Sequence, residues 1–410
     1  MNEQDSPKET PLHSRHLQLG ASMAPFAGWD MPLWYKAGAI KEHLAVVQAA
    51  GLFDTSHMDV IQVAGDAVRE FLDFAFTRDL SEAQPGRCYY GAFLDERGFC
   101  LDDGIVYPIT ENRYAVVLNA SMGAPIRSHL ATLPDAAAVE VSEPLPRLAK
   151  LDVQGPAAAG LVAGLLRKPA ELFARFPYFT FKGDFDLNQS EVELDDGTPA
   201  FLSRTGYTGE QGFEVFIPGD KAGAVWDRLL EAGAGKGLLP CGLAARDSLR
   251  TGAVLPLSHQ DIGAWPFVNH PWPFALPLDS DGAFDKKFNG SDAINPETAP
   301  HTLAFVGFDP RRVDGHGSTV LLDGKEIGIV STIVSDMAIG RVDGAVLSLS
   351  SPGKPEGWTP RGLCCGFVRV DRHLPPGTEL TLKDARREIK VAVAADIRPD
   401  RTARKKLPAL

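Results

Sequence analysis

Two adjacent aspartates, Asp102 and Asp103, stand in the middle of a segment with the pattern of a β-strand. In an extended chain the side chains of Leu101–Tyr107 alternate between two faces, so we expect Asp103 to point inward and Asp102 outward. A carboxylate that loses hydration has a raised pKa unless donors or a cation hold it, and such acids gather at functional sites. In one interpretation, Asp103 is an acid that takes part in chemistry. In the plainer interpretation, it is an acid that follows the turn at Arg97-Gly98 and only happens to lie near the start of a strand.

A third acid of interest, Glu214, follows a glycine-rich connection. Gly206, Gly209 and Gly212 recur every three residues, which permits a tight or bulged hairpin and does not match the order of a phosphate-binding loop. In the strand that follows, Glu214 shares a face with Phe216. A carboxylate beside an aromatic ring suits a flat, nitrogen-rich ligand, because its two oxygens accept from adjacent N–H groups. The alternative is a solvated glutamate on an edge strand.

Arg246 and Arg250 lie four residues apart, on one face of an expected helix. Together they can clamp a carboxylate-bearing tail, or they are surface arginines that bind Asp247 or another local acid. His259 and His270 lie eleven residues apart, a spacing that matches no metal-ligand pattern. Since the sequence also lacks a nucleophile elbow, a dinucleotide fingerprint and a Walker motif, we expect no metal site and none of those reaction types.

The elements that position these residues change character along the chain. Strand and helix patterns interleave up to about residue 250, as in mixed α/β units. A helix is expected over 37–50 with Gly51 as its stop, and another helix after a cap at Asp220. From residue 302 onward, short alternating runs separated by turns predict a small antiparallel barrel or sandwich. The boundary is expected in the polar stretch 285–301.

Size and charge limit the classes of partner. At 410 residues the chain exceeds a single core, so two or three packed units are expected. A net charge of −12 argues against nucleic acid or an anionic membrane as the partner, so any anionic ligand must be held by local arginines. Five cysteines without paired spacing fit a reducing compartment, and no apolar run reaches membrane-spanning length. The sequence therefore predicts a soluble, cytoplasmic protein.

Seven sequence blocks occur in a recognisable order. They are TPLHSRHLQLGASMAPFAGWDMPLWY, AAGLFDTSHMDVI, the aspartate pair, VVLNAS, LDVQGP, SRTGYTGEQGFEVF and CGLAARDSLR. In this order they resemble the T-protein of the glycine cleavage system, the tetrahydrofolate-dependent aminomethyltransferase family, closely over about residues 10–270 and loosely beyond.

The resemblance implies an α+β protein of three domains, two α/β domains that bind folate and a C-terminal antiparallel β barrel. The expected folate-binding region is 1–298, with two interleaved subdomains of roughly 1–60 with 147–258 and 61–146 with 259–298, and the barrel is 299–410. It also implies roles for six residues. These are Asp103 as the catalytic acid near the reacting nitrogens, Tyr90 and Asn119 lining the folate cleft, Tyr207 against the folate, Glu214 on the pterin edge, and Arg246 orienting the site or holding a carboxylate.

The implied reaction is transfer of an aminomethyl-derived or methyl group to N5 of tetrahydrofolate, from a small-molecule or lipoyl-carrier-bound donor. Asp103 would then position and support developing charge. Two alternatives stay open, a tetrahydrofolate-dependent N-, O- or S-demethylase and a folate-binding accessory protein without activity. The accessory relatives carry a Lys-Gly-Cys-aromatic-x-Gly-Gln signature that is absent here, which favours an enzyme.

The chain departs from the family pattern on the side of the donor. Arg250-Thr251-Gly252-Ala253 stands where T-proteins usually read Arg-Leu-Glu-Ala, so an acid is missing. The next loop keeps Gln260-Asp261 but continues with Trp265, Trp272 and Phe274, whose rings suit a methylated cation or an aromatic ether, or simply pack the loop. The segment 331–336 replaces Ser-Gly-x-x-Ser-Pro. The basic residues proposed for the glutamate end of folate are Arg250, Arg401, Arg404 and Lys405.

Overall fold

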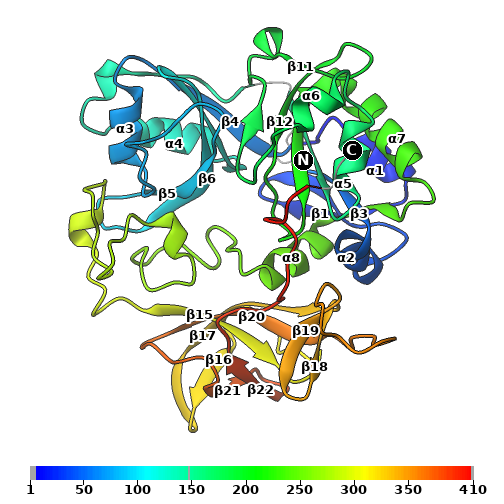
Figure 1. Cartoon of the computed structure of the whole chain (residues 1–410). Helices are drawn as coiled ribbons and strands as arrows, with labels where there is room; N and C mark the ends of the chain where they lie inside the picture. Colours follow the sequence, from blue (N-terminus) through cyan, green and yellow to red (C-terminus); the bar gives the residue numbers. More distant parts are fainter. Residues whose placement is uncertain (1–5, 146–147, 408–410) are drawn as a thin grey trace.

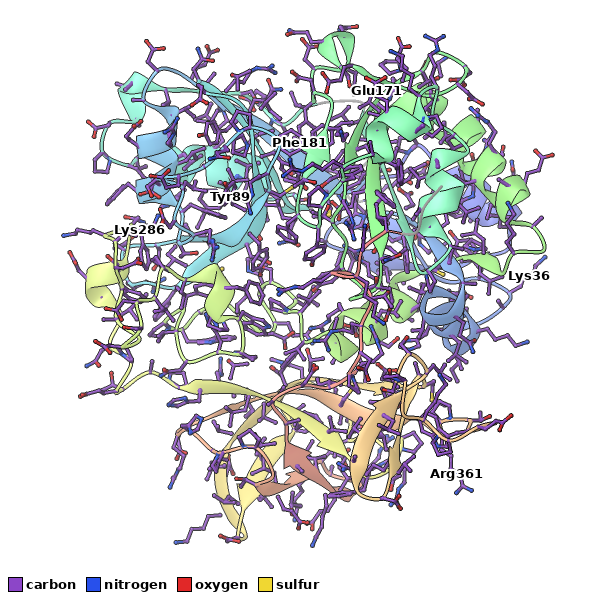
Figure 2. The ribbon with its side chains drawn as sticks, viewed as in Figure 1. Lys36, Tyr89, Glu171, Phe181, Lys286 and Arg361 are labelled. Atoms are coloured by element: carbon purple, nitrogen blue, oxygen red, sulfur yellow. The ribbon has the colours of Figure 1, made fainter. Side chains whose placement is uncertain are left out.

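The computed structural model describes residues 6–145 and 148–407. Two α/β lobes lie above a β barrel, with the five-stranded sheet in one lobe and the seven-stranded sheet in the other (Figure 1). This architecture confirms the expected fold class of two α/β domains and a C-terminal barrel. Figure 2 shows Lys36, Lys286 and Arg361 at the edges of the molecule and Phe181 nearer its centre, in agreement with the burial of Phe181.

The seven-stranded sheet joins distant parts of the chain. Its strand order is β10-β12-β13-β9-β3-β14, with β11 paired to β12, so β3 from the N-terminal region lies beside β9. An apolar core that includes Trp226 fills the space between this sheet and its helices. The strands are β3 (Ala50–Asp54), β9 (Leu148–Gln154), β10 (Phe181–Lys182), β11 (Val192–Glu193), β12 (Pro199–Ser203), β13 (Gly212–Pro218) and β14 (Leu238–Pro240). The helices of this lobe are α1 (His13–Gln18), α2 (Ala39–Gln48), α5 (Ala158–Ala163), α6 (Pro169–Phe173), α7 (Ala222–Gly233) and α8 (Leu243–Gly252).

Two expected helix boundaries in this lobe are wrong. Helix α2 ends at Gln48, and Gly51 lies inside strand β3 and stops no helix. A Cβ on Gly51 would meet the Sγ of Cys241 at 2.7 Å, so this glycine serves close packing. Asp220 lies in a 3-10 turn, and the residue before α7 is Lys221, without a side-chain cap.

The five-stranded sheet has the order β5-β6-β7-β4-β8. Strand β6 carries the aspartate pair between β5 and β7, with Asp103 opposite Ala92 of β5. Its elements are β4 (Met58–Ala64), β5 (Tyr89–Leu94), β6 (Cys100–Thr110), β7 (Arg113–Ala120), β8 (Glu140–Val141), α3 (Val68–Ala75) and α4 (Gly123–Leu130). A two-stranded ribbon of β1 (Ser22–Phe26) and β2 (Trp29–Trp34) and 3-10 turns at Ala136–Ala138, Leu187–Gln189, Gly219–Lys221, Pro273–Ala275 and Ser291–Ala293 complete the lobes.

The C-terminal strands close into an antiparallel barrel in the order β15-β20-β17-β16-β21-β22. Not every alternating run after residue 302 joins the barrel, because β18 and β19 pair in a separate two-stranded ribbon outside it. The strands are β15 (His301–Gly307), β16 (Thr319–Leu322), β17 (Lys325–Asp336), β18 (Ile339–Val342), β19 (Ala345–Ser348), β20 (Leu363–Val370), β21 (Glu379–Lys383) and β22 (Glu388–Val393).

The barrel docks on helix α8 through a buried arginine, Arg398. Its guanidinium donates to Asp336 of β17 at 2.8 Å and lies 3.3 Å from Glu210. A Cβ on Gly252 would collide with the Asp336 carboxylate and come within 2.6 Å of Arg398. The acid missing after Arg250 is therefore matched by a carboxylate on the barrel, which occupies the space beside Gly252.

The domain boundaries themselves stay a prediction. Strands β4 to β8 lie between Met58 and Val141, and the first of them begins two residues before the expected division at 60. The expected division at 146/147 and the chain ends at 1 and 410 lie outside the described residues. Within the described part of the chain, no helix has the length and apolar character that a membrane crossing needs.

Candidate active site

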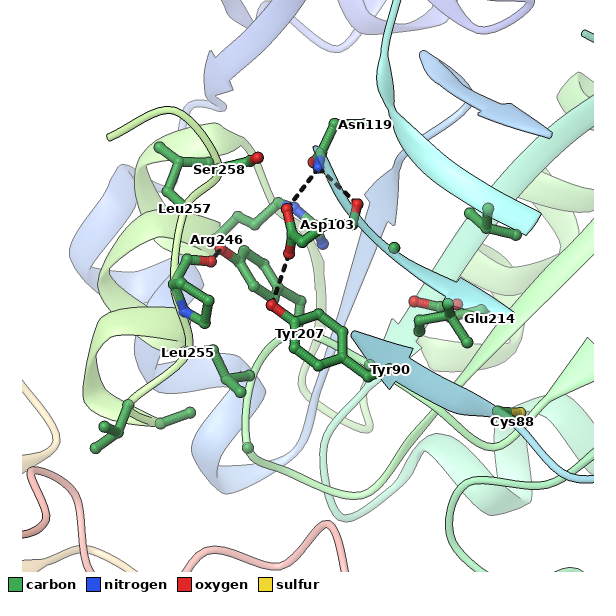
Figure 3. Close-up of a pocket in the computed structure, with 18 of the residues that line it drawn as sticks. Cys88, Tyr90, Asp103, Asn119, Tyr207, Glu214, Arg246, Leu255, Leu257 and Ser258 are labelled. Carbon is green, nitrogen blue, oxygen red and sulfur yellow. Dashed lines mark hydrogen bonds between the residues drawn. The ribbon is translucent and has the colours of Figure 1, made fainter. Parts of the chain in front are cut away.

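A cavity of about 1350 Å³ opens between the two sheets and the loop that follows α8 (Figure 3). Its volume exceeds the roughly 300–1,000 Å³ of an ordinary ligand pocket, which leaves room for two ligands at once. The C-terminal segment closes one side through residues 395–404. All six residues expected in the site line this cavity, namely Tyr90, Asp103, Asn119, Tyr207, Glu214 and Arg246.

The two aspartates of β6 lie in one hydrogen-bond network. The amide nitrogen Nδ2 of Asn119 donates to an Oδ1 of each carboxyl at 2.8 Å. Figure 3 shows the Asp103 side of this network, in which the Tyr90 hydroxyl donates to Oδ2 of Asp103 at 2.7 Å. The expected outward orientation of Asp102 is wrong, because Asp102 is 0% exposed and Asp103 is 9% exposed. Partners from β7 and from the loop after α8 cover Asp102, and strand alternation could not reveal them.

Burial changes the protonation of this pair. Burial, followed by the nearby Asp103 charge, raises the pKa of Asp102 to about 8, and burial raises the pKa of Asp103. Two buried carboxyls so close do not both ionise readily near neutral pH, so the pair holds a proton there. A carboxyl pair that shares a proton can both accept and donate one, which is the property that acid–base chemistry needs.

Glu214 lies across the cavity from Asp103 (Figure 3). It is 5% exposed, and its Oε1 lies 3.0 Å from the ammonium of Lys150. Its other oxygen, Oε2, accepts no hydrogen bond from any described residue. A buried carboxylate oxygen without a donor is costly, so this atom fits a ligand that brings an N–H group. The edge-strand alternative is wrong, because β13 lies between β12 and β9.

Arg246 and Arg250 lie in different surroundings in the structure. Arg246 donates to Asp152 at 3.1 Å and stacks 4.7 Å above the centre of the Tyr207 ring, at the cavity wall. Arg250 is fully buried away from the cavity and pairs with Asp261 and Asp247. The expected clamp of both arginines on one ligand is therefore wrong, and Arg250 is a structural cation between α8 and the barrel.

Comparisons with known proteins agree with this geometry. The family model of the GCVT N-terminal domain matches residues 12–265, more than half of the chain. The chain belongs to the glycine cleavage T-protein family. This membership confirms the resemblance expected from the seven sequence blocks.

Members of the T-protein family cover most of the chain. It is 36% identical to an aminomethyltransferase of Streptomyces coelicolor over 82% of this chain and 87% of that protein. It is 34% identical to an aminomethyltransferase of Bacillus subtilis over 83% and 90% of the two chains. The glycine cleavage system aminomethyltransferase T from Bartonella henselae has 26% identity and a TM-score of 0.77, over 98% of this chain and all of the other.

No role in the site was predicted for several residues that lie at or beside the cavity. His57 is buried, and burial together with the Arg246 charge lowers its pKa to about 4. Ser258 and His259 approach Asp102 from the loop after α8. Lys150 pairs with Asp152 at 2.6 Å beneath Glu214. The alternation of β9 predicts that Lys150 and Asp152 share a face, so this pair could have been found from the sequence.

Some of the residues proposed for the glutamate end of folate and for the donor loop line the cavity, and others do not. Arg401 and Arg404 line the cavity, whereas Lys405 does not. Trp272 is fully buried and donates to the Val254 carbonyl at 2.8 Å, and Trp265 stacks on Arg369. The packing interpretation therefore describes both tryptophans, and Phe274 is the ring of that loop that reaches the cavity.

Proposed function

We propose that this T-protein family member is an aminomethyltransferase that moves a one-carbon unit to N5 of tetrahydrofolate. The proposed donor is an aminomethyl group on the lipoyl arm of a carrier protein. Family membership supports the reaction, and the relatives named above are aminomethyltransferases. The observation that carries the proposal for this chain is the free, buried Oε2 of Glu214, which faces the cavity opposite Asp103.

The described residues fit a reduced folate. Bound tetrahydrofolate would supply a nucleophilic nitrogen, N5. Glu214 offers an acceptor for the N–H groups of the pterin edge, and the rings of Tyr90 and Tyr207 offer apolar walls on the cavity. Arg401 and Arg404 offer positive charge where the C-terminal segment borders the cavity, which suits the carboxylates at the far end of folate.

Glu214 and Asp103 have different roles: Glu214 binds the pterin, and Asp103 takes part in the chemistry. Glu214 holds the pterin while Lys150 keeps its Oε1 occupied and its orientation fixed. The Tyr90 hydroxyl and the Asn119 amide orient Asp103, which can take a proton or support developing positive charge. Arg246 holds Tyr207 in place by stacking on its ring, while Asp152 anchors the guanidinium.

The test is a transfer assay with tetrahydrofolate and a panel of donors, including aminomethyl-lipoyl carrier and small N-, O- and S-methyl compounds. We expect transfer from the carrier and a loss of about 10²- to 10⁴-fold in rate for Asp103→Asn with folate binding retained. Asp281→Asn, an exposed change remote from the cavity, is the matched control. Transfer from a methylated compound alone would indicate a demethylase instead, and folate binding without turnover on any donor would indicate an accessory protein.

A further inference from the structure

Helix α8 ends in a turn that has an unusual residue at its central position. The N–H of Leu255 donates to the carbonyl of Arg250 at 2.9 Å, and the next N–H back, that of Val254, donates to the carbonyl of Thr251 at 2.9 Å. These two bonds form a Schellman motif, in which the residue after the C-cap has a left-handed conformation and is usually glycine. Here that residue is Val254, with φ of 56°. A β-branched side chain is disfavoured in this region, so the turn is strained.

A buried side chain from the following loop holds this strained turn. The carbonyl of Val254 accepts the indole N–H of Trp272 at 2.8 Å. Trp272 is 0% exposed, and its ring packs edge-on against Phe367 of the barrel with the ring centres 5.5 Å apart. Because the barrel fixes the indole, its N–H holds the Val254 peptide in one orientation.

The segment that follows the turn forms one wall of the cavity. Residues 253–260 line the cavity without interruption. The carbonyl of Pro256 accepts the hydroxyl of Tyr207, and the hydroxyl of Ser258 donates to Oδ1 of Asp102 at 3.2 Å. The direction in which the chain leaves α8 therefore determines where these two contacts with the site lie.

The valine side chain itself belongs to the cavity wall. Val254 is 9% exposed, lines the cavity and lies in the same apolar cluster as Trp272. Glycine would adopt the left-handed turn freely, but it would leave a gap between the cavity and this cluster. An unfavourable backbone conformation in the wall of a candidate active site points to a function.

We propose that Trp272 is a positioning residue, whose indole N–H clamps the strained turn at Val254 and so fixes segment 255–260 against Tyr207 and Asp102. Trp272 is not among the described residues that line the cavity, so it acts through Val254 and not on a ligand. This inference rests on the proposed function, because the clamped wall serves the transfer reaction. Without the clamp the turn relaxes, and the Ser258 hydroxyl moves away from Asp102.

The folate wall on the other side of the segment has its own support. The guanidinium of Arg246 lies 4.7 Å from the centre of the Tyr207 ring and donates to Asp152 at 3.1 Å. Neither contact involves segment 255–260. Loss of the clamp should therefore lower kcat more than it raises the KM for tetrahydrofolate.

Trp272→Phe removes the N–H and keeps an aromatic ring against the barrel. We expect kcat to fall about tenfold or more while the KM for tetrahydrofolate stays within about threefold, because a displaced group costs rate more than binding. Trp265→Phe is the matched control. Trp265 lies in the same loop, stacks on Arg369 and is absent from the described cavity lining, so this variant should transfer as the wild type does.

Val254→Gly separates the clamp from simple packing of the indole. Glycine adopts the left-handed turn without strain, so the turn no longer needs the clamp. In the Val254→Gly background, Trp272→Phe should therefore lower kcat by less than about twofold, whatever Val254→Gly does by itself. If Trp272 only packs the loop, its replacement gives the same loss in both backgrounds.

A second readout needs no turnover. The Leu255 amide bonds to the Arg250 carbonyl within the turn, so its hydrogen exchange in the folate-free chain reports opening of the turn. Trp272→Phe should speed this exchange about fivefold or more, and Val254→Gly added to it should slow the exchange again. If Trp272→Phe folds poorly, 3-benzothienylalanine at this position tests the same bond, because its ring has the shape of indole but no N–H.

The two proposals fail in different ways. A wild-type chain that transfers nothing refutes the proposed function and leaves the exchange test of the clamp valid. Unchanged exchange at Leu255 in the variant without the indole N–H refutes the clamp. Unchanged kcat in that variant, or an equal loss of kcat with and without Val254→Gly, refutes the positioning role of Trp272.

Discussion

Replacement of Glu214 by alanine should weaken tetrahydrofolate binding about 5- to 150-fold. Oε1 of Glu214 is occupied by Lys150 at 3.0 Å, and Oε2 is free for the ligand. Without the carboxylate, the N–H groups of the bound pterin are buried without an acceptor, which costs about 1–3 kcal/mol, or about 5- to 150-fold in affinity. Lys150 keeps Asp152 at 2.6 Å, so the fold should survive the change.

Calorimetric titration with tetrahydrofolate measures this loss. Glu214→Gln keeps one acceptor oxygen but brings an amide donor, so its loss should fall between those of the wild type and Glu214→Ala. Glu191→Ala, an exposed acid in the same lobe, is the control and should bind as the wild type does. If a folded Glu214→Ala variant binds with unchanged affinity, the carboxylate does not contact the ligand and the assignment of the pterin subsite is wrong.

Three further predictions concern buried charge and packing. The pKa of Asp102 is about 8 in the folded chain and about 3.9 in the unfolded chain. Protonation of Asp102 therefore stabilises the folded chain fully below about pH 4, and this stabilisation is lost as the pH rises to about 8. The free energy of unfolding should fall by at most about 1.4 kcal/mol per pH unit in this range. Urea unfolding at pH 6 and 8.5 should show this decline, and Asp102→Asn should flatten it; an equal slope would contradict the raised pKa. Arg250→Met leaves Asp261 buried without its cation and should lower the free energy of unfolding by about 3–5 kcal/mol, whereas Arg361→Met on the surface should change it by less than about 0.5 kcal/mol. Gly252→Ala crowds the carboxylate of β17 and should cost about 1–3 kcal/mol in the same assay; a stabilised variant would mean that the barrel does not dock as described.

Local patterns predicted much of the fold. Strand and helix patterns interleave before residue 250, as the mixed α/β prediction required, and strand β4 at Met58–Ala64 shows such a local alternation. The change from mixed helix and strand patterns to short alternating runs near residue 300 indicated the barrel, whose first strand begins at His301. The ends of helices were predicted less accurately. Gly51 was expected to end a helix but packs against Cys241, a residue far along the chain that local patterns do not reveal.

Local patterns singled out Asp103, Glu214 and Arg246, and the resemblance added Tyr90, Asn119 and Tyr207. The structure brings all six to one cavity. Periodicity alone misjudged Asp102, because long-range partners such as Ser258 bury a side chain that alternation turns outward. It also grouped Arg246 with Arg250, although helix α8 presents one to the cavity and the other to the barrel. Sequence spacing fixes which residues share a face but not what covers that face.

The central claim is that a reduced folate lies between Glu214 and Asp103. A crystal structure of the chain with bound tetrahydrofolate tests this claim most directly. We expect Oε2 of Glu214 within about 2.7–3.2 Å of a pterin N–H nitrogen and the reactive nitrogen on the side of Asp103. A pterin bound elsewhere, or in the cavity with Glu214 facing water and Asp103 remote from N5, would contradict it.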